Sequence, residues 1–167
     1  MRKKKETKGK FKVIDLNLLG SYAILLYAGG RSGEACETAL DVMKSIKGDY
    51  FVETDGTTKG KFESDKLFNK HLSNIRSNLT PCKENNYLNN PFGRRVSNII
   101  WVNSDLIYEE KSILTVFVHE ASHWIDWRFY NLGIDDTEIR SRVLGYLFEN
   151  IYDFTKEILK EEKKKRK

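Results

Sequence analysis

The chain has 167 residues, of which 40% are hydrophobic and 12% aromatic, and this length and composition exclude a disordered or fibrous protein and predict one globular domain. The net charge of +5 is concentrated at the two ends. Residues 1–12 hold seven basic side chains and one acidic, residues 156–167 hold seven basic and three acidic, and the part between them is mildly acidic, so no recognised nucleic-acid-binding module is expected.

Two tails flank the predicted domain. We expect a basic flexible tail over residues 1–12, a single domain over residues 13–158 and a basic C-terminal tail over residues 159–167. The tails alone would give only salt-sensitive, sequence-independent binding to nucleic acid or to an anionic membrane.

The two cysteines, Cys36 and Cys82, lie far apart in the sequence and form no C-x-x-C pair. This argues against a disulfide framework and a cysteine metal cluster, and it favours a reducing, cytoplasmic location. An apolar segment over residues 13–28 follows the basic start, as in a signal peptide, but polar residues and a glycine interrupt it and no clear cleavage site follows. The segment is also too short to span a membrane, so we expect it to be the first core element, with export left open.

Apolar segments in the first half of the chain predict two helices and a pair of strands. Residues 16–28 are apolar on most faces and are followed by two glycines, which favours a buried helix over a strand. Residues 33–46 carry apolar side chains at helical spacing and predict a second helix. Residues 50–54 predict a short strand, followed by an Asp-Gly turn and a partner strand at Lys61-Phe62.

The middle of the chain predicts a helix, a loop and a strand. Residues 63–78 suit an amphipathic helix, on which His71 is expected at the surface. Residues 80–95 are polar and rich in turn-forming residues and predict a long loop. Residues 96–102 are rich in β-branched and aromatic side chains and predict a strand. It is either an ordinary core strand or one beside the functional site that pairs with an extended peptide.

Two long helices complete the chain. The first is expected to have Ser112 as its cap, to run to about Tyr130 and to stop at Gly133. The second covers residues 135–160 and has apolar side chains at helical spacing along one face. The predicted fold class is therefore α+β, a helix-rich domain with a small sheet.

The first of these helices contains the sequence His119-Glu120-Ala121-Ser122-His123, which has the form H-E-x-x-H. At about 3.6 residues per turn, His119 and His123 lie one above the other on one helical face, close enough to bind one metal ion. In zinc sites of this kind the adjacent carboxylate removes a proton from the metal-bound water, which predicts metal-assisted hydrolysis. The alternative is that both histidines are structural and that Glu120 is an exposed helix residue.

A catalytic zinc site needs a third protein ligand. The candidates in the sequence are Asp126, Asp135, Asp136, Glu138 and His71. Asp126 lies on the helical face of the histidines but about 10 Å along the axis from His119, and it suits the role of orienting an imidazole ring better. Glu138 is preferred because it opens the next helix. The alternative for Glu138 is a capping box with Asp135 as the N-cap and Glu138 at the third helical position.

With these residues, the chain resembles the zincin metallopeptidases that use a glutamate as the third ligand, over about residues 98–150. It also resembles compact zincin-like domains encoded by phages and mobile elements, in which H-E-x-x-H-x-x-D precedes an E-x-x-x-R helix. The resemblance implies a zincin-like domain around an H-E-x-x-H active-site helix. It further implies one Zn²⁺ held by His119, His123 and Glu138, and Glu120 as general base.

The chain departs from two better-known patterns of these enzymes. Metzincins have glycine and histidine where this chain has Asp126 and Phe129, and thermolysin-like enzymes have aspartate where it has Arg142. No motif marks the donor that stabilises the oxyanion, and the candidates are Tyr130, Arg142 and Tyr146.

The sequence therefore predicts a zinc-dependent metallopeptidase that hydrolyses peptide bonds of a protein or peptide substrate, with no specific nucleic-acid partner and no transmembrane segment. One alternative is a catalytically silent zincin-like module that binds or senses a metal. Another is a nucleic-acid- or membrane-associated accessory protein that acts through its basic tails.

Overall fold

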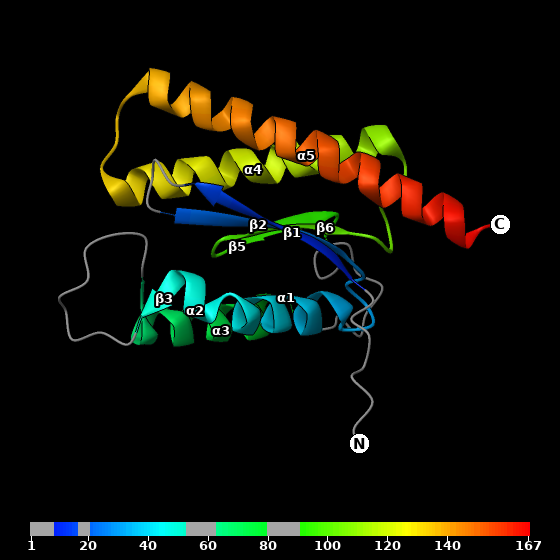
Figure 1. The fold of residues 1–167 in the computed structure, drawn as a ribbon, viewed down its shortest axis with the longest axis horizontal. Coiled ribbons are helices and arrows are strands. Elements are labelled where there is room, and N and C mark those ends of the chain that lie inside the picture. Colours follow the sequence, from blue (N-terminus) through cyan, green and yellow to red (C-terminus); the bar gives the residue numbers. More distant parts are fainter. Residues whose placement is uncertain (1–8, 17–20, 53–62, 80–90) are drawn as a thin grey trace.

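The computed structural model describes residues 9–16, 21–52, 63–79 and 91–167. Helices lie on both faces of a central sheet, so that these residues form three layers (Figure 1). One helical layer comes from the first half of the chain and the other from its C-terminal part. The predicted α+β class is confirmed.

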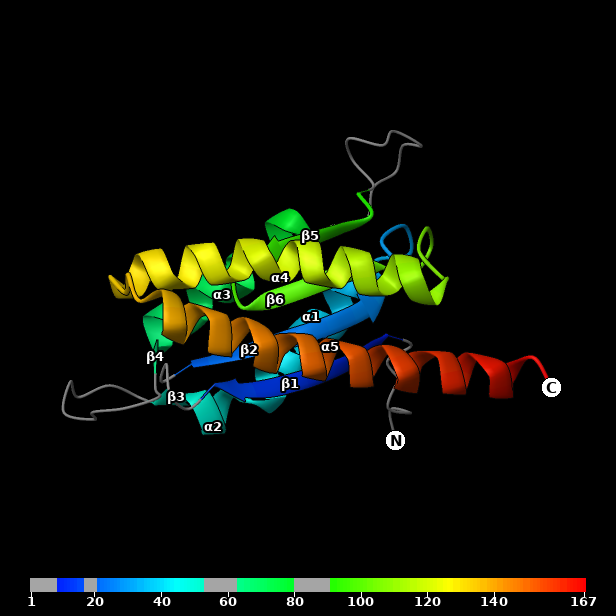
Figure 2. The same cartoon turned by 90° about the horizontal axis from the view of Figure 1, so that it is seen from above.

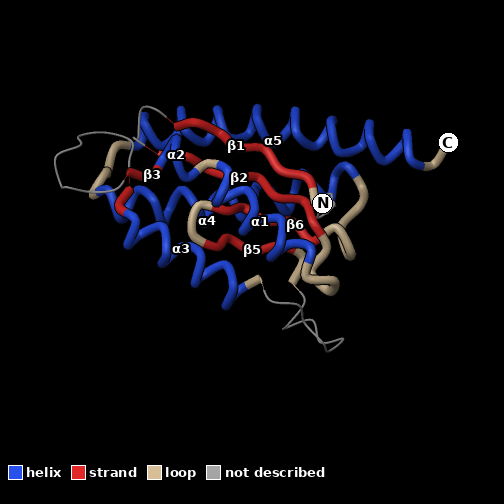
Figure 3. Tube along the Cα trace, turned by 60° about the horizontal axis from the view of Figure 1, so that its bottom comes forward, coloured by secondary structure: helices blue, strands red, loops and turns tan. Residues whose placement is uncertain are grey.

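The central sheet has four strands in the order β1 (Lys10–Leu16), β2 (Ser21–Ala28), β6 (Ile99–Asn103) and β5 (Gly93–Val96) (Figure 3). β2 and β6 pair in parallel, and each outer strand is antiparallel to its neighbour. Among the described strands, β5 therefore forms one edge of the sheet, and it belongs to the segment for which the sequence predicts a loop.

The first apolar segment is a strand, and the helix predicted over residues 16–28 is wrong. All eight residues of β2 are buried, because the strand lies between β1 and β6 and helices cover both sheet faces. A strand buried on both faces is apolar at every position, so its sequence lacks the alternation of a half-exposed strand and resembles that of a buried helix. The aromatic and β-branched residues Tyr22, Ile24 and Tyr27 are the signal that favours a strand.

The layer on one face of the sheet contains α1 (Glu34–Ser45), the short α2 (Lys47–Tyr50) and α3 (Asp65–Asn78). α1 and α3 confirm the helices predicted over residues 33–46 and 63–78. Their apolar side chains pack with those of β2 and β6 in one of two hydrophobic clusters.

A second, two-stranded sheet accompanies this layer. β3 (Phe51–Val52) pairs in parallel with β4 (Glu63–Ser64). Of the short strand predicted over residues 50–54, the structure therefore shows residues 51–52. The predicted Asp-Gly turn and the partner strand at Lys61-Phe62 lie outside the described residues.

The layer on the other face consists of α4 (Glu110–Leu132) and α5 (Thr137–Lys165), which lie side by side over the sheet (Figure 2). α4 ends at Gly133, whose φ of 63° lies in the left-handed region, as the sequence predicts. α4 begins earlier than predicted, with Glu109 rather than Ser112 as its N-cap. None of the helices in the described ranges has an apolar stretch long enough to cross a membrane.

Strand and helix extend into both predicted tails. β1 begins at Lys10, whose Nζ lies 3.2 Å from a carboxylate oxygen of Glu161 and 3.0 Å from one of Glu162. α5 continues to Lys165, so most of the predicted C-terminal tail is helical. Residues 1–8 lie outside the described residues.

α4 packs one face against the sheet and α5. The buried side chains recur every three or four residues and belong to Ile113, Phe117, Ala121, Trp124, Ile125 and Phe129. The ring centroids of Phe117 and Phe154, a residue of α5, are 5.8 Å apart. Because the apolar side chains occupy this face, the two histidines of H-E-x-x-H lie on the opposite face.

Candidate metal centre

His119 and His123 lie one turn apart on the exposed face of α4, as their spacing predicts. The His119 side chain is 65% exposed. The buried neighbours Phe117, Ala121 and Trp124 determine this orientation, because they anchor the opposite face of the helix in the core. The packing around the motif thus fixes which face of α4 points inward and leaves both histidines exposed.

The two imidazole rings meet through their Nε2 atoms, which are 3.1 Å apart. Their planes are nearly perpendicular, at 88°, and their centroids are 4.7 Å apart. Two nitrogens that each lie about 2.0–2.1 Å from a tetrahedral zinc ion are about 3.3 Å from one another, so the observed separation fits two positions of such an ion. It also suits a hydrogen bond in which one ring donates its N–H to the other. The pair can therefore share either an ion or a proton.

Glu120 lies on the flank of α4 that faces strand β5. Its side chain is only 13% exposed, and its Oε1 lies 4.0 Å from Nε2 of His119. α5 contacts the other side of α4, so β5 and α5 lie on opposite sides of this helix (Figure 2). The carboxylate is therefore sheltered next to an accessible imidazole, at the edge of the sheet.

A groove of about 450 Å³ runs between α4 and the chain around the start of β5. His119 and Glu120 form part of its wall. The other lining residues are Pro91, Phe92, Gly93, Thr115 and Val116. The groove thus combines the two ionisable side chains of the motif with mainly apolar neighbours, which is the usual composition of a binding site for an organic ligand.

Gly93 allows this close approach of strand and helix. A Cβ atom at residue 93 would lie 2.6 Å from the carbonyl oxygen of Trp101, 2.6 Å from Cγ1 of Val116 and 3.3 Å from Cγ of Glu120. The carbonyl belongs to the backbone of β6 and cannot rotate away. Any larger residue must therefore push β5 away from α4.

We expect Gly93→Ala to destabilise the protein by about 1–3 kcal/mol, the usual cost of overpacking a close contact. The free energy of unfolding from urea denaturation measures this effect. Gly145→Ala is the matched control, because nothing lies within 4 Å of a Cβ at residue 145 and alanine favours a helix over glycine. Equal stability of Gly93→Ala and the wild type would contradict the close packing of β5 on α4.

The structure does not bring Glu138 to the histidine pair. The side chain of Glu138 is 71% exposed at the start of α5, and its Oε1 accepts a hydrogen bond of 2.9 Å from Nε of Arg142. Within the described ranges, no group of three or more histidine, cysteine, aspartate or glutamate side chains is close enough to hold a metal ion. The arrangement thus supplies two of the donors that a zinc site needs.

The cap of α5 also differs from the one considered in the sequence. Asp136, not Asp135, is the N-cap, and its Oδ1 accepts hydrogen bonds of 2.9 Å from the N–H of Glu138 and 3.0 Å from that of Ile139. The helix begins one residue later than the predicted capping box requires, so Glu138 lies at the second helical position. The Asp136 carboxylate is therefore hydrogen-bonded to the backbone of α5.

Asp126, the candidate for orienting an imidazole ring, pairs instead with Arg140 of α5. The pair links the exposed side of α4 to the first turn of α5. Of the candidates for the oxyanion donor, Arg142 pairs with Glu138. Tyr130 and Tyr146 are exposed at 86% and 46%.

His71 is buried, and its predicted place at the surface is wrong. The residue is 5% exposed and lies on α3, in the layer on the other face of the sheet from α4 (Figure 1). It follows the buried Phe68 by three residues and precedes the buried Ile75 by four, which places all three on the helical face that packs inward. The sheet therefore separates His71 from the candidate site.

Sequence reasoning missed one charged residue next to the site, Arg95. Its guanidinium carbon lies 4.8 Å from the ring centroid of Trp127, a residue of α4. Burial lowers the pKa of Arg95, and the negative charge of Glu120 acts in the opposite direction. The signal in the sequence was weak, because β5 has only four residues, two of them arginines.

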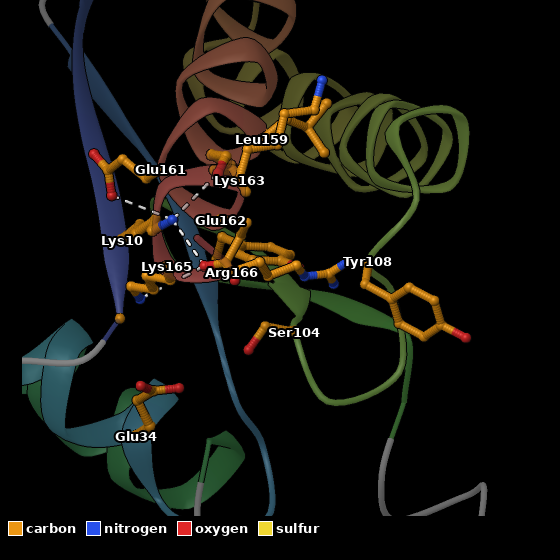
Figure 4. Close-up of a pocket in the computed structure, with 13 residues that line it drawn as sticks. Lys10, Glu34, Ser104, Tyr108, Leu159, Glu161, Glu162, Lys163, Lys165 and Arg166 are labelled. Atoms are coloured by element: carbon orange, nitrogen blue, oxygen red, sulfur yellow. Dashed lines mark hydrogen bonds and ion pairs between the residues drawn. The ribbon is translucent and has the colours of Figure 1, made fainter.

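A larger cavity, of about 930 Å³, lies where the C-terminal end of α5 approaches the start of β1 (Figure 4). Four of its charged side chains pair with one another: Lys10 with Glu161 and Glu162, and Lys165 with Glu162 at 3.6 Å. The hydroxyl of Tyr27 donates a hydrogen bond of 2.8 Å to a backbone carbonyl, and burial raises the pKa of Tyr27 to about 12. No residue of the H-E-x-x-H motif lines this cavity.

Comparisons of the chain with protein families, with curated proteins and with solved structures found no match.

Proposed function

We propose that the protein is a zinc-dependent peptidase, with His119 and His123 as metal ligands and Glu120 as general base. The observation that carries the proposal is the 3.1 Å separation of the two Nε2 atoms, of which that of His119 belongs to the same groove as the sheltered Glu120 carboxylate. Accessible paired imidazoles on an otherwise well-packed helix contribute little to folding, and their separation suits a shared divalent cation.

Zinc bound to the two histidines would supply a Lewis acid and lower the pKa of a coordinated water to about 7. Glu120 accepts the proton of the attacking water on a carboxylate oxygen and passes it to the nitrogen of the leaving amine. Its low exposure of 13% favours this role, because a carboxylate shielded from bulk solvent keeps its proton close to the reacting atoms.

Strand β5 is suited to hold the substrate. Among the described strands it is an edge strand, so the backbone groups along its outer side have no partner in the sheet. An extended peptide that pairs with this edge lies along the groove that contains His119 and Glu120. Backbone pairing would position a peptide bond without selecting side chains, which supports a protein or peptide substrate.

The third ligand is the part of the proposal that needs a change in the structure. To act as the ligand, the Glu138 carboxylate must leave Arg142, in an exposed pair that contributes at most about 1 kcal/mol, and must also move to the histidine pair. We expect Glu138→Ala to lower zinc affinity by more than about 100-fold, since loss of a ligand exceeds the 10–100-fold cost of losing an outer partner. Competition with a chromogenic chelator measures the affinity.

Arg142→Ala is the control for this prediction, because it removes the ion pair and leaves the carboxylate. It is expected to keep or increase zinc affinity. If Glu138→Ala binds zinc as tightly as the wild type, Glu138 is not the ligand, and the same measurement on Asp126→Ala and Asp135→Ala tests the remaining carboxylates that do not cap α5.

A proteolysis screen of zinc-loaded protein tests the proposed activity. A mixture of denatured proteins and unstructured peptides is incubated with the protein, and the products are identified by mass spectrometry. We expect new chain ends that disappear when zinc is removed with a chelator and return when zinc is added back. Zinc binding without any cleavage would contradict the peptidase proposal.

One observation favours a second candidate, a zincin-like module that binds or senses a metal without turnover. Within the described residues no third donor accompanies the histidine pair, so the arrangement as it stands matches a weak metal site better than a complete catalytic one. The same screen separates the two candidates, because this module binds zinc and yields no products.

A further inference from the structure

The two arginines of β5 lie on opposite faces of the sheet. Nη1 of Arg94 donates a hydrogen bond of 3.1 Å to the backbone carbonyl of Asn78, at the end of α3. Gly93 and Arg95 face the other layer, because Gly93 contacts Val116 and Arg95 contacts Trp127, both residues of α4. Strand alternation thus places Arg95, and not Arg94, on the side of the candidate active site.

Arg95 is held over an aromatic ring and is not neutralised there. Its guanidinium carbon lies 4.8 Å from the ring centroid of Trp127, within the range of a cation–π contact. Its Nη1 donates a long hydrogen bond of 3.4 Å to the carbonyl oxygen of Ser97. No described carboxylate forms an ion pair with it. A guanidinium has five N–H donors, so most of its hydrogen-bonding capacity is available to a ligand.

The negative charge of Glu120 opposes the lowering of the Arg95 pKa by burial, although the two side chains form no ion pair. Both side chains belong to the flank between α4 and β5, and Trp127 follows Glu120 by seven residues, which is two helical turns on the same face. The order along this flank is therefore the apolar groove near Phe92, then Glu120 opposite Gly93, then Arg95 on Trp127.

We infer that Arg95, supported by Trp127, forms a subsite that selects a carboxylate of the bound peptide. The inference rests on the proposed function and adds its substrate class, a peptide with an acidic group next to Arg95 and an apolar side chain in the groove. The guanidinium is suited to this task because its planar donors match a carboxylate and the indole ring holds it in place.

The strand geometry gives the position of the acidic group. Gly93 and Arg95 are two residues apart on one face of β5, which corresponds to about 6.8 Å along a strand. In a peptide paired with this edge, every second side chain points to the same face of the sheet as Gly93 and Arg95. The selected carboxylate therefore belongs to the residue two positions from the one opposite Gly93, on the N-terminal side if the peptide runs antiparallel to β5 and on the C-terminal side if it runs parallel.

A positional-scanning library of octapeptides, acetylated and amidated at their ends, tests the inference with zinc-loaded wild-type protein. We expect peptides with aspartate or glutamate at the position two residues from the one opposite Gly93 to be cleaved at least about tenfold faster than peptides with glutamine or lysine there. A hydrogen bond to a charged group is worth this factor or more. A second library with free C-terminal carboxylates distinguishes a chain end from an acidic side chain as the source of the carboxylate.

Arg95→Glu and Arg94→Glu form the matched pair of variants, because they make the same change of charge at neighbouring positions on opposite faces. Arg95→Glu is expected to reverse the preference from acidic to basic residues, whereas Arg94→Glu retains the wild-type preference. Arg95→Lys should keep the preference in weakened form, because lysine preserves the charge without the planar donors.

Failure of this inference is distinguishable from failure of the proposed function. Cleavage without any acidic preference, or a preference that survives Arg95→Glu, overturns the subsite and leaves the peptidase intact. If no peptide is cleaved, tryptophan fluorescence with a glutamate-containing octapeptide and its glutamine counterpart measures binding alone. Selective binding that Arg95→Glu removes then supports the subsite without the activity, and equal binding of both peptides overturns it.

Discussion

Glu120→Gln is expected to slow peptide cleavage by about 10²–10⁴-fold, the usual contribution of a positioned general base. Glutamine has nearly the same shape as glutamate, so the packing against Gly93 is retained, but its amide cannot accept the proton of the attacking water. Because Glu120 is not proposed as a ligand, zinc content is expected to stay at the wild-type value. Initial rates on a peptide found in the proteolysis screen, together with zinc analysis of the same sample, measure both quantities.

Glu149→Gln is the control for this variant, since it makes the same substitution at an exposed position on α5. It is expected to cleave at the wild-type rate. Full activity of Glu120→Gln with zinc bound would contradict the role of Glu120 and would require another base in the groove.

His119→Asn and His123→Asn are each expected to weaken zinc binding by more than about 100-fold and to reduce cleavage to background. Each substitution removes one of two nitrogens that are 3.1 Å apart, and a single exposed imidazole binds zinc weakly. The free energy of unfolding in the absence of metal is expected to change by no more than about 0.5 kcal/mol, because the exposed face of α4 contributes little to the core. Chelator competition and urea denaturation provide the two measurements.

Tyr130→Ala controls for effects of the exposed surface itself. Tyr130 is 86% exposed and follows His123 by seven residues, on the same side of α4. Its removal is expected to leave zinc affinity unchanged. Zinc affinity that survives His119→Asn and His123→Asn would show that the ion binds elsewhere.

The motif helix was predictable because its signals are local. The pattern of apolar residues around His119 and His123 gives the buried face, Gly133 supplies the residue that tolerates a positive φ, and the spacing of four places both imidazoles on one face. The helices α1 and α3 were predictable from the same periodicity.

The sheet was harder to predict, because its strands depend on their neighbours. β2 is apolar throughout because both of its faces are buried. The spacing of its apolar residues therefore does not distinguish it from a buried helix. β5 has only four residues and contains two arginines, so its sequence resembles a loop. Its strand character arises from pairing with β6, which the sequence of β5 alone does not encode.

Whether a third ligand completes the candidate metal site could not be predicted for a related reason. Two histidines on one helix are placed by helix geometry, but a third donor on another element depends on how the two elements pack and on competing partners. For Glu138 the competitor is Arg142, four residues away on the same helix, and for Asp126 it is Arg140 across the turn. Local ion pairs of this kind are visible only in the folded chain.

Native mass spectrometry of the intact wild-type protein during titration with zinc measures whether the histidine pair binds a metal ion. We predict saturation at one zinc ion per chain and no zinc adduct for the double variant His119→Asn/His123→Asn at the same free-metal concentration. Absence of a specific zinc adduct on the wild-type protein, or the same adduct on the double variant, would contradict a metal centre at the histidine pair.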